Sequence, residues 1–239
     1  PITNPYDLVL TAGGDVLVTD SGRNSVIRIT PNGDISDYAL FPNEPIPDTG
    51  ETIQAVPTGA AWGPDGALYV ATLTGWPHPA GAATVYRVAD TNADGDATDE
   101  GEVTSYLTGF SAATDLVFEA DGSLLVTEFS TQMKALVSDL TLENAADLPG
   151  RLVRRGFDGI ASVVAGDLVG PTAVAVLGDR VFVSEEFAGR VIEVGGTDQR
   201  ILSSFGWVLS IVAGIGTTLL VGGALLAIQQ RYQREENLA

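Results

Sequence analysis

The sequence contains no cysteine and only one histidine and one methionine among its 239 residues. The missing cysteines exclude disulfides, cysteine-ligated zinc, c-type haem attachment and thiol catalysis. Lys134 is the only lysine, and the formal net charge is −19. Because phosphate binding needs clustered Lys and Arg, this balance argues against a nucleic-acid partner. The acidity instead indicates a solvated outer surface or a salt-adapted source.

A hairpin unit occurs four times along the chain. Each copy has a short apolar run, a glycine-containing turn such as Pro64-Asp65-Gly66, and a second apolar run. Glycine supplies the positive φ that a tight turn needs. The copies are Tyr6–Asp20, Pro57–Thr72, Thr114–Glu128 and Thr172–Glu185. Their spacing of roughly 52 to 57 residues is typical of propeller blades.

Each unit continues into one or two further apolar segments, which predicts three or four antiparallel strands per blade. We therefore expect residues 1–195 to form an all-β propeller with four blade repeats, either closed with four or part of a larger ring. Two interruptions stand out. Residues 41–55 contain several prolines and indicate a loop, and residues 133–148 are a candidate short helix.

The chain changes character after residue 195. No charged residue occurs from Ile201 to Gln230, a length sufficient to cross a bilayer as a helix. We predict a linker at 196–204, a transmembrane helix at 205–230 and a cytoplasmic tail at 231–239, since Arg231 and Arg234 follow the apolar segment. The propeller is then periplasmic or extracellular. The alternative for this segment is a buried core helix.

Small residues recur every four positions in the predicted span. Residues at this spacing share one helix face, which lets another membrane helix approach closely. The row therefore predicts an interface with a second copy or with a larger membrane complex, although glycine is also simply common in membrane helices. Its members are Gly206, Ser210, Gly214, Thr218 and Gly222.

An acidic loop spans Asp90–Glu102. Its first half fits the calcium-loop pattern, with oxygen ligands at alternate positions followed by Gly95. Its end departs from that pattern, because Gly101 stands where a bidentate Glu is expected. We expect either a Ca²⁺ site that stiffens the loop or a solvated acidic hairpin tip. The candidate ligands are Asp90, Asn92, Asp94, Asp96, Asp99 and Glu102.

A second candidate site lies at the start of the innermost strands, where propellers open into their channel. The equivalent positions are Asp7, Gly59, Asp115 and Ala173. Asp7 and Asp115 could bind a metal or polarise water, or they could cap strand ends. The same ambiguity holds for the acids that end the second strands, Asp20, Glu128, Glu185 and Glu186. His78 lies in a stiff Pro-flanked loop without an accompanying catalytic motif.

The run Leu73–Val88 resembles the ScyD/ScyE family of exported propellers, which are related to NHL-repeat proteins. The likeness covers about residues 4–195, and the other matching segments are Asn4–Leu8, Gly109-Phe110 with Asp115-Leu116, Asp121–Leu124 and Gly170–Thr172. The resemblance implies a periplasmic or extracellular β-propeller. It carries over no catalytic residues. This sequence departs in its four visible units where we expect about six, in its acidic loop and in its apolar C-terminal segment.

The sequence as a whole favours a binding protein over an enzyme. We expect a membrane-anchored propeller that serves as an accessory or scaffolding subunit of a larger membrane complex, such as a respiratory or photosynthetic one. Two alternatives stay open. One is a metal-dependent propeller hydrolase or lactonase, and the other is a calcium-stabilised ligand-binding or adhesion module.

Overall fold

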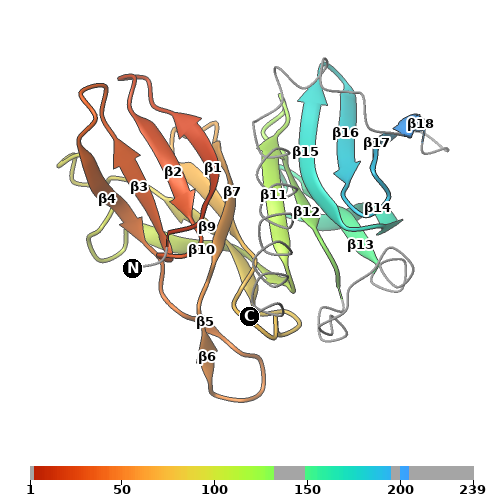
Figure 1. Cartoon of the computed structure of the whole chain (residues 1–239), viewed down its shortest axis with the longest axis horizontal. Coiled ribbons are helices and arrows are strands. Elements are labelled where there is room, and N and C mark those ends of the chain that lie inside the picture. Colours follow the sequence, from red (N-terminus) through yellow and green to blue (C-terminus); the bar gives the residue numbers. More distant parts are fainter. Residues whose placement is uncertain (1–2, 132–148, 195–199, 205–239) are drawn as a thin grey trace, which may run out of the picture. The chain divides into compact units, whose positions relative to one another are not determined.

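The computed structural model describes residues 3–131, 149–194 and 200–204, and every regular element in these ranges is a β-strand. Sixteen of the strands form four antiparallel sheets, each with four strands in sequence order from the inner strand outward. This arrangement confirms the predicted all-β propeller with four blades (Figure 1). The C-terminal helix predicted at 205–230 lies outside the described residues.

The blades follow one another along the chain. Blade 1 comprises β1 (Pro5–Leu10), β2 (Val16–Asp20), β3 (Ser25–Ile29) and β4 (Ile35–Leu40). Blade 2 comprises β7 (Pro57–Trp62), β8 (Leu68–Thr72), β9 (Ala83–Val88) and β10 (Val103–Phe110). Blade 3 comprises β11 (Ala113–Phe118), β12 (Leu124–Glu128), β13 (Gly150–Arg155) and β14 (Ala161–Leu168). Blade 4 comprises β15 (Pro171–Leu177), β16 (Arg180–Glu185), β17 (Arg190–Val194) and β18 (Arg200–Ser204).

Glycine closes the turn between the first two strands of every blade. Gly14, Gly66, Gly122 and Gly178 have φ values of 89°, 80°, 85° and 65°. Side chains with a Cβ rarely adopt this left-handed conformation. The turns are therefore fixed by local sequence, as the repeat pattern predicts.

The hydrophobic core lies between the blades rather than within one sheet. In β8, Leu68 and Val70 pack against blade 1, whereas Tyr69 and Ala71 pack against blade 3. Successive strand residues point to opposite faces, so one strand serves two neighbours. All five residues of β8 are buried for this reason. Blades 3 and 4 share a third cluster that includes Leu125 from β12 and Ile192 from β17.

The inner strands pack in a series, β1 on β7, β7 on β11 and β11 on β15. In the part of the chain that the structure describes, β15 and β1 do not pack along one another. Among the described residues, blade 1 packs on blade 2 through one face of its sheet. In its strand β2, Val16 and Val18 are half-buried, whereas every residue of β8 and β12 is buried.

Two predicted segments differ in detail from the structure. Residues 41–55, expected as a loop, contain a small hairpin formed by β5 (Glu44–Pro45) and β6 (Thr52–Ile53). The linker expected at 196–204 includes the outer strand of blade 4, because Arg200–Ser204 pairs with Arg190–Val194. This strand has no alternating pattern of apolar and polar residues, and it runs directly into the apolar segment, so the sequence does not mark it as a strand.

Other predictions fall on residues that the structure does not describe. These are the candidate helix at 133–148, the span at 205–230 and the small-residue row from Gly206 to Gly222. Among the described residues, no helix is long and apolar enough to cross a membrane.

Candidate functional site

The two channel aspartates each join neighbouring blades. Asp7 follows a register shift at the start of β1, and Asp115 follows an equivalent shift in β11. The Asp7 Oδ2 atom accepts the backbone N–H of Ala60 in blade 2, at 2.9 Å. The Asp115 Oδ2 atom accepts the N–H of Val174 in blade 4, at 2.8 Å. Each carboxylate thus connects its own inner strand to that of the following blade.

The second oxygen of each aspartate is also engaged. Asp7 Oδ1 accepts the N–H of Leu8 at 2.7 Å, and Asp115 Oδ1 accepts that of Leu116 at 2.8 Å. All four carboxylate oxygens therefore have backbone donors. The geometry assigns these residues a bracing role between blades, which corresponds to the strand-capping alternative raised by the sequence.

Gly59, the equivalent position in blade 2, makes room for one of these braces. A Cβ at this position would lie 2.5 Å from Asp115 Oδ1 and 2.6 Å from Asp115 Cα. Only glycine permits this approach without displacing backbone. The sequence pattern showed that an acid was missing here, but it could not show that Asp115 occupies the space.

The environment of the aspartates perturbs their titration. Burial, and then the nearby charge of Asp7, raises the pKa of Asp115 to about 7. Burial likewise raises the pKa of Asp7, although the hydrogen bonds from Ala60 and Leu8 oppose the shift. Burial, followed by the charges of Asp115, Glu186 and Asp7, raises the pKa of the Tyr6 phenol. Acidic groups from blades 1, 3 and 4 therefore interact in one region.

A set of hydroxyl groups adds further links between the blades. Ser21 Oγ donates to the Pro57 carbonyl at 2.6 Å, which joins blade 1 to blade 2. Thr58 donates to the carbonyl of Ala113, and Thr114 donates to that of Pro171, both at 2.9 Å. In each of these three bonds, the accepting carbonyl belongs to the residue two positions before the channel position of the next blade. In blade 1 the corresponding residue is Pro5.

The acids that end the second strands form a separate, buried set. Glu128 accepts the N–H of Ser111 at 2.6 Å and is paired with Arg151, while Glu185 accepts the N–H of Val169 at 2.7 Å. The partner of Glu185 is Arg190. Asp20 accepts backbone N–H groups from residues 4, 22 and 23. These carboxylates tie the entry of each inner strand to the second strand. Glu186, by contrast, is exposed.

Blade 2 obtains its buried carboxylate from elsewhere in the chain. Thr72 ends the second strand of blade 2, at the position where the other blades have an acid. Its hydroxyl donates to Glu44, from the hairpin of β5 and β6, at 3.1 Å. The other Glu44 oxygen accepts from Thr84 at 3.1 Å, and burial raises the pKa of Glu44. Sequence reasoning missed this residue. The sequence held one signal for it: the second strand of blade 2 ends in Thr72, whereas those of the other blades end in an acid.

The acidic loop at Asp90–Glu102 is held by its own hydrogen bonds. Asp90 accepts the N–H groups of Ala93 and Gly95, at 2.6 and 2.9 Å. The Asn92 amide donates to Asp94 and to Asp99, at 3.0 and 2.7 Å. Asp96 accepts from Thr98, and Glu102 accepts from Thr91. Within the described ranges, no group of three or more His, Cys, Asp or Glu side chains is arranged to hold a metal ion.

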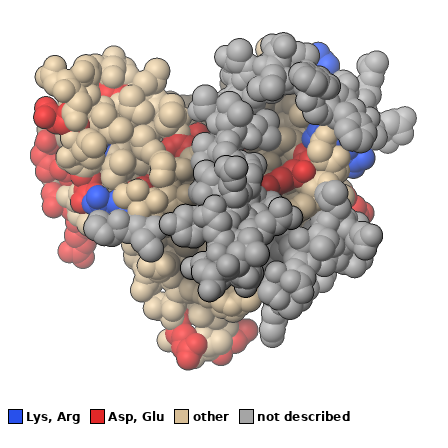
Figure 2. All heavy atoms as spheres, in the orientation of Figure 1, with Lys and Arg blue, Asp and Glu red and all other residues tan. Residues whose placement is uncertain are grey.

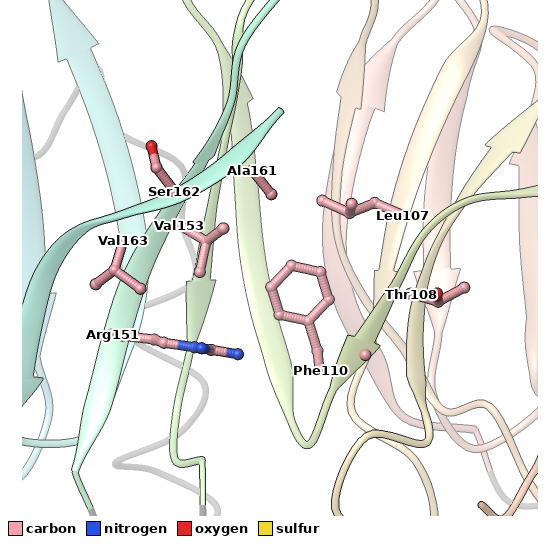
Figure 3. A pocket seen from close by; sticks show the side chains of 9 residues that line it. Leu107, Thr108, Phe110, Arg151, Val153, Ala161, Ser162 and Val163 are labelled. Carbon is pink, nitrogen blue, oxygen red and sulfur yellow. The ribbon is translucent and has the colours of Figure 1, made fainter. Parts of the chain in front are cut away.

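His78 lies in a Pro-flanked loop, and a small cavity lies elsewhere, between blades 2 and 3. The His78 Nδ1 atom lies 3.3 Å from the Leu73 carbonyl, and burial lowers the pKa of the ring. A cavity of about 160 Å³ lies between β10 of blade 2 and the outer strands of blade 3. Figure 3 shows the Phe110 ring and the Arg151 guanidinium pointing into it. None of the residues that line it comes from an inner strand, where the channel positions lie.

Comparison with known proteins gives the fold but no family. No family model and no curated protein matches the chain. A gluconolactonase from Xanthomonas campestris aligns with 85% of this chain at 15% identity and a TM-score of 0.58. A second protein, assigned as a gluconolactonase, aligns with 85% of this chain at 16% identity and a TM-score of 0.55. A streptogramin B lyase aligns with 84% of this chain, also at 16% identity and a TM-score of 0.55.

These identities support a shared fold and nothing finer. The chain spans 63%, 64% and 55% of the length of the three matched proteins, respectively. The matched propellers therefore contain more polypeptide than the four blades described here.

Proposed function

We propose that this protein is a binding subunit, a membrane-anchored extracytoplasmic propeller that acts as an accessory or scaffolding component of a larger membrane complex. The observation that carries the proposal is the use of the channel aspartates. Both oxygens of Asp7 and both oxygens of Asp115 accept backbone N–H groups, so the residues best placed for chemistry brace the blades instead.

Two features of the sequence support the membrane part of this proposal. The uncharged segment from Ile201 to Gln230 has the length of a bilayer span, and Gly206 to Gly222 supplies a small-residue face for helix packing. The resemblance to the ScyD/ScyE family favours an extracytoplasmic propeller. The partner complex is then an integral membrane assembly that binds the span, the blades or both.

A mild-detergent purification from native membranes tests the proposal. The full chain should sediment with membranes, resist carbonate extraction and copurify with defined polypeptides in constant ratio. Recovery only as a lone monomer would contradict the binding role. Recovery in the aqueous fraction after ultracentrifugation would contradict the anchor.

A second candidate is a propeller hydrolase of the lactonase type. Two observations favour it, namely the shared fold with gluconolactonases and the pKa of Asp115, which is raised to about 7 beside Asp7. A carboxyl group that titrates near neutrality can serve as a general acid or base. The proposal would place Asp115 and Asp7 at the reacting centre.

Hydrolysis of gluconolactone by the purified full chain tests this alternative. Activity that disappears in Asp115→Ala but persists in the surface control Asp121→Ala would favour it. A thermal melt of each variant separates lost activity from lost folding, because Asp115 also braces blade 4. Absence of turnover by the folded wild-type chain, with and without added divalent cations, would remove gluconolactone as a substrate.

A further inference from the structure

The β5–β6 hairpin, residues 44–53, carries one buried side chain among residues that are exposed or half-buried. Its two strands pair with each other and, among the described residues, with no strand of a blade. Figure 1 shows the hairpin extending away from the four-stranded sheets. Glu44 is 1% exposed, whereas residues 45 and 47–52 are exposed. Figure 2, in the same orientation, shows acidic side chains where the hairpin ends, as expected for a segment surrounded by water.

The other hydrogen bonds of the hairpin are internal. Its ladder pairs Glu44 with Ile53, and the Ile46 N–H donates to the Glu51 carbonyl at 2.8 Å. The hydroxyl and the N–H of Thr49 both donate to the Ile46 carbonyl. Within the described residues, the Glu44 carboxyl is therefore the group through which the hairpin is hydrogen-bonded to a blade.

Three hydroxyl groups surround the Glu44 carboxyl. Its Oε1 atom lies 3.1 Å from Thr72 Oγ1 on β8, and its Oε2 atom lies 3.1 Å from Thr84 Oγ1 on β9. The phenol of Tyr86, also on β9, hydrogen-bonds to the same carboxyl. Burial, and then the charge of Glu44, raises the pKa of this phenol, so it stays neutral. None of the three groups can balance a negative charge on Glu44.

This environment differs from that of the buried acids in blades 3 and 4. Glu128 is paired with Arg151, and Glu185 is paired with Arg190. Among the described residues, Glu44 has no ion pair with an Arg, Lys or His side chain. Because a buried carboxylate without a cation is strongly disfavoured, burial raises the pKa of Glu44.

The hydrogen atoms available at Thr72 also favour a protonated Glu44. The Thr72 hydroxyl accepts the N–H of Thr84 at 2.9 Å and lies 2.9 Å from the Thr84 carbonyl oxygen. Its single hydrogen can donate either to this carbonyl or to Glu44, so an ionised Glu44 leaves one of the two acceptors without a full hydrogen bond. A neutral Glu44 removes the competition, because its own O–H donates to Thr72 while Thr72 donates to the carbonyl.

The charged and titratable groups on the surrounding elements do not balance the buried carboxyl. Arg87, the cation of β9, is paired with Asp65 at 2.8 Å. His78 lies in the loop after β8, and burial lowers the pKa of its ring, so it is mainly neutral at pH 7. Asp48 and Glu51, the other acids of the hairpin, are exposed to water.

We propose that Glu44 is held as a neutral carboxylic acid and that its ionisation releases the β5–β6 hairpin from blade 2. The proton passes to water, and the charged side chain then leaves the three hydroxyl groups. A two-stranded hairpin of this length is not stable by itself in water, so the released segment loses its internal hydrogen bonds. This inference goes beyond the proposed binding function and does not depend on it, because it concerns the chain alone.

The direction of the pH dependence follows from the raised pKa. The pKa of Glu44 in the folded chain lies above the ordinary value near 4.5, so the attachment is complete below that value and weakens as pH rises toward the folded pKa. Within this window the opening constant of the hairpin should increase about tenfold per pH unit, and above it the constant should level off. Protonation of His78 would act in the opposite direction, since it would add charge to the neighbouring loop as pH falls.

Amide hydrogen exchange of the purified full chain between pH 5 and pH 8 tests the proposal. The peptide that covers residues 44–53 reports on the hairpin, and the peptide that covers residues 68–72, which form β8, reports on the blade. After correction for the intrinsic exchange rate at each pH, the opening constant of the hairpin should rise with pH, while that of β8 should change little.

The variant Glu44→Gln distinguishes a neutral acid from an ionised one. The glutamine amide N–H donates to Thr72 and its carbonyl accepts from Thr84, as in the neutral acid. The variant should therefore keep the hairpin attached at pH 8, remove the pH dependence of its exchange and melt no lower than the wild type. Glu51→Gln, a control at an exposed position of the same hairpin, should retain the wild-type pH dependence.

Four results would overturn the inference. They are a hairpin opening constant that does not change from pH 5 to pH 8, one that changes equally in Glu44→Gln, one matched by an equal change in β8, and a Glu44→Gln variant that melts below the wild type at both pH values. The last result would show that Glu44 is an ionised brace of the same kind as Glu128.

Discussion

Replacing Glu128 by Gln isolates the contribution of a buried carboxylate brace. The Glu128 side chain is 1% exposed, accepts the N–H of Ser111 at 2.6 Å and pairs with Arg151, which is 31% exposed. Glutamine keeps the size but has one acceptor oxygen and no charge. One charge-assisted hydrogen bond is therefore lost, and a buried donor faces another donor.

The expected loss of unfolding free energy is about 2–3 kcal/mol, because hydrogen bonds to charged groups contribute about 1.5–3 kcal/mol each. Water around the partly exposed Arg151 limits the penalty for its unpaired charge. At roughly 2–4 °C per kcal/mol for a domain of this size, the melting temperature should fall by roughly 4–12 °C. Thermal denaturation of the full chain in detergent, followed by circular dichroism, measures the change.

Two further variants make the comparison decisive. Glu185→Gln removes the equivalent brace in blade 4, where Arg190 is the partner, and should cost a similar amount. Glu193→Gln removes a partner from the surface pair with Arg180, whose side chain is 47% exposed, and should cost less than about 1 kcal/mol. If Glu128→Gln destabilises the chain no more than Glu193→Gln does, the bracing role of the buried acids is refuted.

Three other predictions concern the channel and the acidic loop. Gly59→Ala should destabilise the chain by about 1–3 kcal/mol in denaturant unfolding, because its Cβ would meet Asp115, whereas Gly166→Ala, with open space around it, should be nearly neutral. The pKa of Asp115 is raised from 3.8 to about 7, so the folded chain binds this proton more tightly than the unfolded chain does. The free energy of unfolding should therefore decrease as pH rises from about 4 to about 7. The melting temperature of the wild type should exceed that of Asp115→Asn by less at pH 8 than at pH 5. A difference in melting temperature that does not change with pH would contradict the raised pKa. If the loop at residues 90–102 binds Ca²⁺, a chelator should lower the melting temperature and excess Ca²⁺ should restore it, and identical midpoints would remove the ion from the account.

The sequence alone was sufficient for the blades, because the determinants of a hairpin are local. A glycine such as Gly66 sets the turn, and alternating apolar residues on either side set which faces are buried. The repeat then implied a shared core between sheets. The sequence also located Asp7, Asp115 and Glu128 at strand ends, although it could not decide between chemistry and bracing.

Only the tertiary structure decided what these residues contact. Glu44 and Thr72 are hydrogen-bonded although 28 positions separate them in the sequence, and 59 positions separate Asp115 from Val174, whose N–H it accepts. Asp115 also fills the space that Gly59 leaves open. Such contacts depend on how whole blades are placed beside one another, and no residue spacing along the chain encodes that placement.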